Sequence, residues 1–181
     1  MFKNLLLVFI LSCFIMSSGY IYLDKVLEVK DTGTEVLYVR AFAVSARPVL
    51  GHLEITKKAL GEYYKSFEGV NIMLGHEKGD PNLCIGRVLK ASVKHDRDRK
   101  VDYIEIIFKV FTQDAINKIK TGQYYYLSVG MQDIESDHPA LTGGTRIITE
   151  FTGDEVSFVG SPRDKYARVL EFSEKLEEVL E

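Results

Sequence analysis

Hydrophobic and polar positions alternate along several short runs of the chain, as they do in β-strands. Residues 20–29 and 35–44 are two such runs, rich in Tyr, Val and Leu, and they flank the turn-forming sequence Asp-Thr-Gly-Thr at 31–34. Alternation with a period of two places one set of side chains on a buried face, and a short link containing glycine is typical of a hairpin. We therefore predict a β-hairpin over residues 20–44.

A helix, a glycine and a strand are predicted next. Residues 57–68 carry apolar side chains at helical spacing, with Thr56 in front of them as the N-cap and Gly69 behind them as the C′ residue. The segment from Val70 then alternates in polarity up to His76. His76 is therefore expected at the end of a strand.

The same order recurs in the second half of the chain. Thr112 precedes a segment with an acidic residue in its first turn and lysines in its last turn, which suits the helix dipole, and Gly122 ends it. Residues 124–129 then form a predicted strand that contains Ser128. Each unit thus places one chemically competent residue, His76 or Ser128, in a strand or directly after one.

A second hairpin is predicted between these two units. Residues 86–93 and 101–110 are β-rich runs, and they flank the charged sequence Asp-Arg-Asp-Arg-Lys at 96–100. A run of charges between two strands is most simply a solvated turn.

The last part of the chain is predicted to be more varied. Residues 133–144 are polar and irregular, whereas residues 147–151 and 156–159 have the pattern of late strands. Residues 166–181 carry apolar side chains at the spacing of an amphipathic helix.

Composition places the chain among globular proteins. Its 181 residues are 46% hydrophobic and 27% charged, and they contain no internal repeat and no linker rich in Pro, Gly or Ser. We predict one α+β domain, mostly β, over residues 20–165, preceded by a hydrophobic segment at 1–19 and followed by the helix at 166–181.

Charge and cysteine content narrow the function classes. The net charge is −3, so no basic surface indicates nucleic acid or anionic lipid as a partner. Cys13 and Cys84 cannot form a disulfide framework, which favours a reducing compartment for the folded part.

The N-terminal segment resembles a secretory signal peptide. Residues 5–16 form an apolar run behind Lys3, and small residues follow at 17–19. The run is shorter than the roughly 20 apolar residues that a membrane span needs. A hydrophobic first strand, a propeptide and a start codon assigned too far upstream stay open as alternatives, and we expect membrane contact only if the segment is retained.

Serine and histidine are the parts of an acyl-transfer enzyme. A serine hydroxyl is a weak nucleophile and needs an imidazole within hydrogen-bond reach to remove its proton, and an acidic group then orients the imidazole. His76 and Ser128 are the candidates, against the alternatives of a buried histidine and a small strand residue. Residues available as the third group are Asp133, Asp137, His138, Glu150, Asp154 and Glu155.

Other kinds of site are disfavoured. The sequence His76-Glu77 lacks the second histidine of a zinc helix, so we expect no metal. Gly143-Gly144 has neither the spacing nor the lysine of a phosphate-binding loop, and Cys84 is more simply a small buried residue. No cofactor is expected.

Several segments, taken in order, resemble the prohead proteases of tailed bacteriophages, which are serine peptidases of capsid maturation. The resemblance covers residues 36–165 and lies in the segments 40–44, 55–60, 67–76, 85–88, 115–122, 127–130 and 155–159. These proteases are distantly similar to the herpesvirus assemblins. The resemblance implies a small β-barrel-like core of antiparallel strands surrounded by helices.

The resemblance also implies roles for individual residues. His76 matches the family's general base, Ser128 its nucleophile, and Glu155 its acidic residue, with the adjacent Asp154 as the alternative if the alignment slips by one position. Backbone N–H groups near Ser128, helped by Arg146 or Arg163, are the candidates for stabilising the oxyanion.

The implied substrates are scaffold and major capsid proteins, and the enzyme itself, inside proheads in the host cytoplasm. The signal-like segment 1–19 conflicts with that setting and leaves export open, and a homo-oligomer also stays open. The rival hypothesis is a non-catalytic assembly protein with a protease-like fold, which binds scaffold through residues 133–144 and the helix at 166–181. An exported β-domain with a binding role is a third alternative.

Overall fold

The computed structural model describes residues 35–49, 53–77, 79–137 and 144–180. Residues 33–181 form one compact unit. The hydrophobic segment 1–19 and the first arm of the predicted hairpin, residues 20–29, lie outside the described residues. The second arm is a strand, and both of its edges pair with later parts of the chain.

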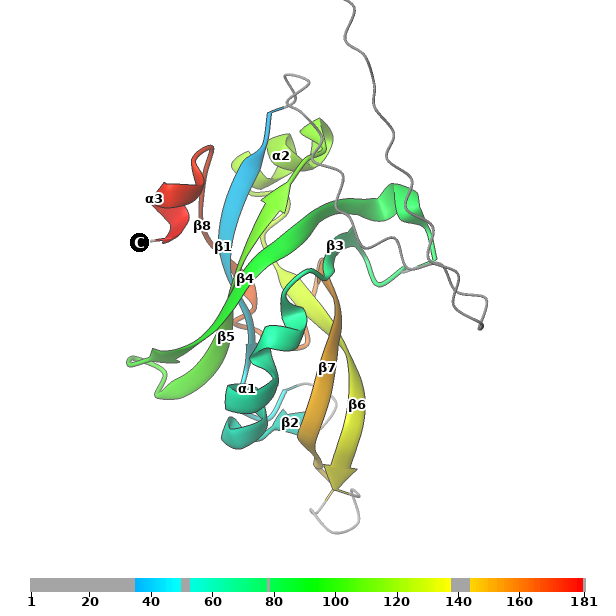
Figure 1. Cartoon of the computed structure of the whole chain (residues 1–181), viewed down its shortest axis with the longest axis vertical. Helices are drawn as coiled ribbons and strands as arrows, with labels where there is room; N and C mark the ends of the chain where they lie inside the picture. Colours follow the sequence, from blue (N-terminus) through cyan, green and yellow to red (C-terminus); the bar gives the residue numbers. More distant parts are fainter. Residues whose placement is uncertain (1–34, 50–52, 78, 138–143, 181) are drawn as a thin grey trace, which may run out of the picture. The chain divides into compact units, whose positions relative to one another are not determined.

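Most of the described chain is β-structure (Figure 1). The strands are β1 (Leu37–Ser45), β2 (Leu53–Ile55), β3 (Asn71–Leu74), β4 (Cys84–Asp96), β5 (Val101–Val110), β6 (Leu127–Asp137), β7 (Arg146–Phe158) and β8 (Arg168–Ser173). The helices are α1 (Lys57–Tyr63), α2 (Gln113–Lys120) and α3 (Leu176–Leu180), with short 3-10 turns at Tyr64–Phe67 and Pro81–Leu83.

The strands form one mixed sheet, in the order β2-β7-β3-β4-β5-β1-β8, and β6 pairs with the other edge of β7. The predicted mostly β class with a few helices agrees with this architecture. The prediction of antiparallel strands throughout is wrong at β7, because β2 and β3 both run parallel to it. Parallel pairing is allowed here because long connections separate these strands from β7 in the sequence.

The continuous sheet is not closed, but its two ends meet at one point. Tyr126, just before β6, forms an isolated antiparallel bridge with Arg168 at the start of β8. Next to this bridge, the Leu127 N–H donates to the Ala167 carbonyl at 3.1 Å and the Val169 N–H donates to the Tyr125 carbonyl at 2.9 Å. The start of β6 is thus tied to the start of β8.

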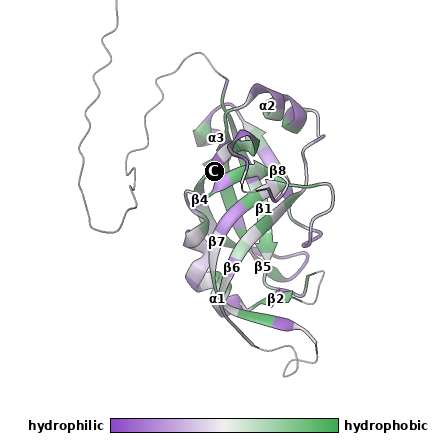
Figure 2. Cartoon of the chain, turned by 90° about the vertical axis from the view of Figure 1, so that its right-hand side faces the viewer, coloured by the Kyte–Doolittle hydropathy of each residue, from purple (hydrophilic) through white to green (hydrophobic). Residues whose placement is uncertain are grey.

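The core lies on the inner face of this sheet. Hydrophobic and hydrophilic residues alternate along several strands (Figure 2), and most of the hydrophobic ones are buried; Leu89, Val93, Leu170 and Phe172 are exposed. The largest fully buried side chains are Phe67, Phe108, Phe151, Leu37, Ile55, Leu60, Ile72, Ile104, Ile106, Ile116, Leu127 and Ile148.

The helix and turn signals were informative at several positions. The Thr56 hydroxyl accepts the Ala59 N–H at 3.1 Å and caps α1, and Gly69 adopts a φ of +83°. Helix α1 is shorter than predicted because its last turn is 3-10. Gly122 adopts a φ of +75° after α2, although Thr112 makes no side-chain capping bond. The hairpin of β4 and β5 forms as predicted.

Three predictions for the last part of the chain are wrong. Residues 133–137 are not irregular, because β6 continues through Asp137 and pairs with β7 across several register shifts. The two predicted late strands are one strand, β7. The predicted helix at 166–181 is the strand β8 followed by the short helix α3, because residues 168–173 hydrogen-bond to the edge of β1. Tertiary pairing here outweighs an apolar spacing that fits a helix.

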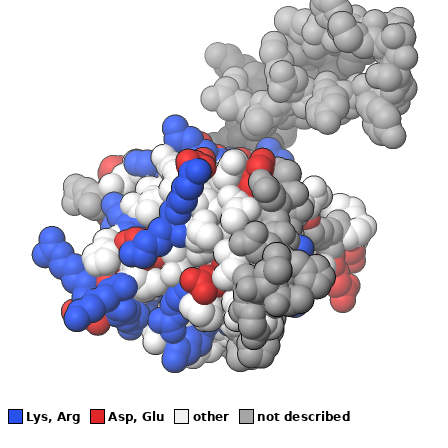
Figure 3. Space-filling model, turned by 90° about the horizontal axis from the view of Figure 1, so that it is seen from below, with Lys and Arg blue, Asp and Glu red and all other residues white. Residues whose placement is uncertain are grey.

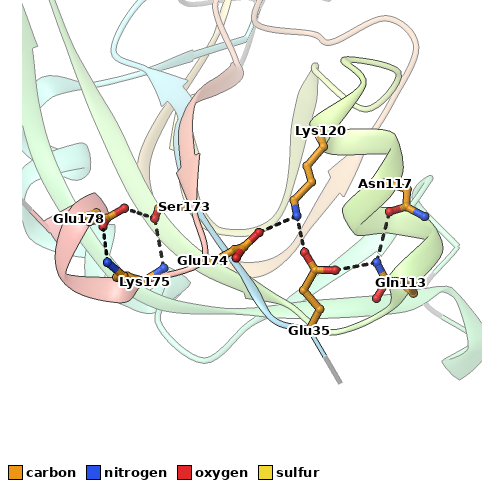
Figure 4. Close-up of polar contacts among 8 residues, drawn as sticks. All are labelled: Glu35, Gln113, Asn117, Lys120, Ser173, Glu174, Lys175 and Glu178. Atoms are coloured by element: carbon orange, nitrogen blue, oxygen red, sulfur yellow. Dashed lines mark hydrogen bonds and ion pairs between the residues drawn. The ribbon is translucent and has the colours of Figure 1, made fainter. Parts of the chain in front are cut away.

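Polar contacts from both ends of α2 join distant segments of the unit (Figure 4). Lys120 pairs with Glu35, which precedes β1, and with Glu174, which follows β8, at 2.9 Å. Gln113 donates to the other carboxylate oxygen of Glu35 at 3.0 Å. None of the helices in the described ranges is long and apolar enough to span a membrane.

Candidate active site

Strand β7 carries two buried polar side chains on one face. Glu155 and Ser157 are 2% and 0% exposed, whereas Val156 and Phe158 between and after them belong to the hydrophobic core. Side chains two positions apart on a strand share a face. The face of β7 opposite the core is therefore polar and covered at this point.

Strand β6 brings Ser128 onto the same face. Ser128 is the register partner of Ser157, and Gly130 is the register partner of Glu155. Residues directly opposite each other on antiparallel strands project to the same side of a sheet. Ser128 therefore lies beside Ser157 and two positions along β6 from Gly130, which is level with Glu155.

His76 reaches this face from the other neighbour of β7. Strand β3 runs parallel to β7 with Met73 opposite Ser157, and the Gly75 N–H donates to the Phe158 carbonyl at 3.1 Å. Gly75 adopts a φ of +68°, a conformation that glycine adopts without a steric penalty. This turn takes the chain out of the strand and directs His76 to Glu155.

The imidazole of His76 is held by a buried carboxylate. His76 Nδ1 lies 2.5 Å from Glu155 Oε1, and the side chain of His76 is 47% exposed while that of Glu155 is 2% exposed. The alternative of a buried histidine is therefore wrong. With Nδ1–H donating to Glu155, the Nε2 of the neutral ring is left as a proton acceptor. The hydrogen bond involves Glu155 and not the neighbouring Asp154.

The hydroxyl of Ser157 supports the carboxylate of Glu155. The Oγ of Ser157 contacts Glu155 Oε2, and it lies 2.6 Å from the carbonyl oxygen of Gly75. Ser157 thereby links the acidic group to the turn that carries His76. A buried carboxylate needs such partners because burial without them is costly.

Gly130 provides the space for this arrangement. A Cβ atom at Gly130 would lie 2.6 Å from Glu155 Oε1 and 2.9 Å from Glu155 Cγ. The carboxyl group of Glu155 therefore lies directly against the backbone of Gly130. Any side chain at this position would displace it.

Ser128 itself is nearly buried, at 6% exposed. Ser128 and His76 are both described, and no hydrogen bond joins them. Ser128 also lines a cavity of about 50 Å³ together with Ala43 and Val44 of β1 and with Arg163 and Asp164. The structure thus brings His76 and Glu155 into direct contact and places Ser128 on the adjacent strand.

The two candidate oxyanion arginines lie in different places. Arg163 lines the cavity beside Ser128. Arg146 is the first residue of β7, eleven positions before Ser157, and therefore roughly 35 Å along the strand from the level of Ser128. Of the two, only Arg163 is near enough to act there.

The thiol of Cys84 makes a different contact. Cys84 is half-buried and its thiol donates to the Gly86 carbonyl at 3.7 Å. No group of three metal-ligating side chains occurs among the residues that the structure describes. The side chains of the candidates Asp133 and Asp137, and all of His138, lie outside the described part of the structure.

The contacts of Ser157 and Gly130 with Glu155 were not predicted from the sequence. Ser157 had a usable signal, since Glu-x-Ser in a strand puts two polar side chains on one face next to a fully apolar one. Gly130 had one too, because glycine inside a strand often marks a close approach of another group. Which residue approaches Gly130 is decided only by the pairing of β6 with β7, which places Glu155 opposite it.

The comparisons with known proteins add no relative. The chain matches no protein-family model, and no curated protein or solved structure shows significant similarity to it.

Proposed function

We propose that the protein is a serine endopeptidase in which Ser128 is the nucleophile, His76 the general base and Glu155 the residue that orients His76. The observation that carries the proposal is the His76–Glu155 hydrogen bond. Glu155 lies on β7, the strand that pairs with β6, which carries Ser128. A carboxylate on Nδ1 fixes the tautomer in which Nε2 accepts a proton. Half-exposure of His76 leaves its outer edge accessible to a substrate.

The proposed reaction is acyl transfer. Nε2 of His76 removes the Ser128 proton as Oγ forms a bond to the peptide carbonyl carbon, and the carbonyl oxygen becomes an oxyanion. His76 then gives this proton to the leaving amine as the C–N bond breaks, and water releases the acyl group by the same steps. Arg163 and backbone N–H groups near Gly130 are the proposed oxyanion donors; loss of one such donor typically costs about 10²–10³ in rate.

Ser128 is a better nucleophile candidate than its neighbour Ser157. The hydroxyl of Ser157 is fully buried and already engaged by Gly75 and Glu155. Ser128 retains some exposure and lines a cavity. The hydrogen bond between Ser128 and His76 is expected to form with substrate, since catalytic hydrogen bonds are often long in free enzymes.

The substrate and setting of the proposal come from the resemblance of residues 36–165 to the prohead proteases. On that basis the substrates are scaffold and major capsid proteins during prohead maturation. The bridge between Tyr126 and Arg168 supports a barrel-like core of the assemblin kind, because it links the strands at the two ends of the open sheet. The rival hypothesis of a non-catalytic assembly protein is weakened, because residues 168–173 of its proposed scaffold-binding helix form a strand.

Labelling with a fluorophosphonate tests the nucleophile. The full chain is incubated with the probe beside Ser128→Ala, and beside Ser92→Ala as a matched control on β4. We expect one adduct, located at Ser128, on the wild type and on Ser92→Ala only, together with cleavage of scaffold protein by those two chains. Adduct formation on folded Ser128→Ala, or none on folded wild type in the presence of scaffold, contradicts the proposal.

A further inference from the structure

Three cationic side chains surround one tyrosine between β7 and β8. The guanidinium carbons of Arg47 and Arg99 lie 4.0 Å and 4.9 Å from the centre of the Tyr166 ring, and Nζ of Lys165 lies 5.1 Å from it. These residues come from three separate segments of the chain. We call this group the Tyr166 cluster.

The Tyr166 cluster has more positive than negative charge. Arg99 is paired with Asp96 at 2.6 Å, but neither Arg47 nor Lys165 forms an ion pair with a described acidic residue. The pKa of the Tyr166 phenol is lowered, first by its hydrogen bond with Arg47 and also by Lys165, which is the response expected of a group in a positive field. Lys and Arg side chains also gather on the face of the molecule drawn in Figure 3.

The backbone places the Tyr166 cluster near Ser128. Ala167, the next residue after Tyr166, accepts a hydrogen bond from the N–H of Leu127, the residue before Ser128, at 3.1 Å. Arg163 lines the same cavity as Ser128. Tyr166 lies two positions before Arg168, and Ser128 two positions after Tyr126, the bridge partner of Arg168, so a peptide bound at Ser128 can reach the cluster within a few residues.

This loop is also held firmly. Asp164 is 5% exposed, and its carboxylate accepts the backbone N–H of Ser45 at 2.9 Å and the hydroxyl of the same residue. It further accepts the Tyr166 N–H at 3.1 Å. The segment carrying Lys165 and Tyr166 is therefore fixed to the end of β1, close to Arg47.

We propose that the Tyr166 cluster binds carboxylate side chains of the polypeptide that Ser128 cleaves, a few residues from the scissile bond. This inference rests on the proposed function for its substrate. Arginine and lysine recognise carboxylates through charge-assisted hydrogen bonds, and the cluster holds unpaired cations for them. A nucleic acid fits less well, because Arg47 covers the ring face on which a base would stack.

Binding to the full-length Ser128→Ala chain tests the inference without turnover. The probes are three fluorescein-labelled molecules: a twelve-residue Gly/Ala/Ser peptide with four glutamates, its counterpart with four glutamines, and a twelve-nucleotide oligothymidylate. We expect the glutamate peptide to bind at least about 10-fold more tightly than the glutamine peptide, and this difference to shrink as salt is raised.

Variants locate the binding site. Arg47→Glu and Lys165→Glu are each expected to weaken the glutamate peptide about 10-fold. Lys165→Arg should retain binding, and the matched control Lys90→Glu, an exposed lysine of β4, should leave it unchanged. Equal binding of the two peptides, equal effects of Lys165→Glu and Lys90→Glu, or tighter binding of the oligonucleotide would overturn the inference.

The two proposals fail in different ways. If the fluorophosphonate labels Ser128 and the peptides bind equally, the proposed function stands and the carboxylate site is refuted. If the glutamate peptide binds through Arg47 and Lys165 but Ser128 is never labelled, the site is supported as a binding surface and the endopeptidase is refuted.

Discussion

Replacing Gly130 by alanine perturbs the proposed active site without removing any polar group from it. The added Cβ would stand 2.6 Å from Glu155 Oε1, and ordinary contact begins at 3.4 Å, so the carboxyl oxygen must retreat by about 0.8 Å. The His76–Glu155 contact is 2.5 Å long, and a retreat of that size directly away would stretch it to about 3.3 Å. We expect kcat/KM to fall roughly 10²-fold, since misplacement by about 1 Å has that effect.

The assay is the rate of fluorophosphonate labelling of Ser128 and the rate of scaffold cleavage, with thermal unfolding measured in parallel. Gly153→Ala is the matched control. Its Cβ would stand 2.7 Å from Phe67 Cδ1, so it strains the core from β7, the strand that carries Glu155, without a close contact to Glu155 itself. Gly153→Ala should lower the melting temperature and spare the labelling rate of the protein that remains folded.

A double-mutant cycle separates this mechanism from general damage. If Gly130→Ala acts by moving Glu155, it should cost little more in a chain that already carries Glu155→Gln, because the two changes affect one group. Full activity of folded Gly130→Ala, or a loss that simply adds to that of Glu155→Gln, would refute the reasoning.

Three further results are expected. Ser157→Ala should lower kcat about 10-fold with a change in KM below about 2-fold, as measured by steady-state kinetics, because its hydroxyl positions Glu155 and does not touch substrate. Glu155→Gln should lower kcat about 10²–10⁴-fold, because it replaces the anionic acceptor at Nδ1 by a neutral amide, which can also donate and so no longer fixes the tautomer of His76. The pKa of Asp102 is lowered by hydrogen bonds from His95 and then from Lys57, so Asp102 stabilises the fold above the unfolded pKa of about 3.9, and this contribution is lost as pH falls through the lower folded value. Asp102→Asn should therefore reduce stability by about 0.3–1 kcal/mol at pH 7 in urea unfolding, and the difference from wild type should shrink below about pH 4; an undiminished difference there contradicts the assignment.

Local signals in the sequence were sufficient for the elements that depend on their own residues. Thr56 and Gly69 mark the two ends of α1 and its 3-10 extension. Both could be predicted because capping and a positive φ depend on a few adjacent residues. The hairpin of β4 and β5 follows from alternation on both sides of a charged turn. Position 155 was singled out by the resemblance. The alternative of a buried His76 is wrong because Gly75 turns the chain out of the strand directly before it.

The remaining features depend on pairing between distant segments. Residues 168–173 have an apolar spacing that fits a helix, and they are a strand because β1 offers a free edge more than a hundred positions earlier in the chain. Likewise, the need for glycine at position 130 arises only because Gly130 lies opposite Glu155. That register is set by the pairing of β6 with β7 over their whole length. The Tyr166 cluster joins three segments, so its charges were indistinguishable from scattered surface residues.

The hydrogen bonds between the start of β6 and the start of β8 bear on the stage of translation at which the proposed active site can assemble. Strand β8 is translated after the other described strands, and only then do the hydrogen bonds of Leu127 and Val169 and the free edge of β1 find their partners. A nascent chain that already contains Ser128, His76 and Glu155 still lacks the lateral support of the strand that holds Ser128. We therefore expect labelling of the proposed nucleophile Ser128 to require the synthesis of β8, so a ribosome-bound chain stalled before residue 168 should remain unlabelled by a fluorophosphonate.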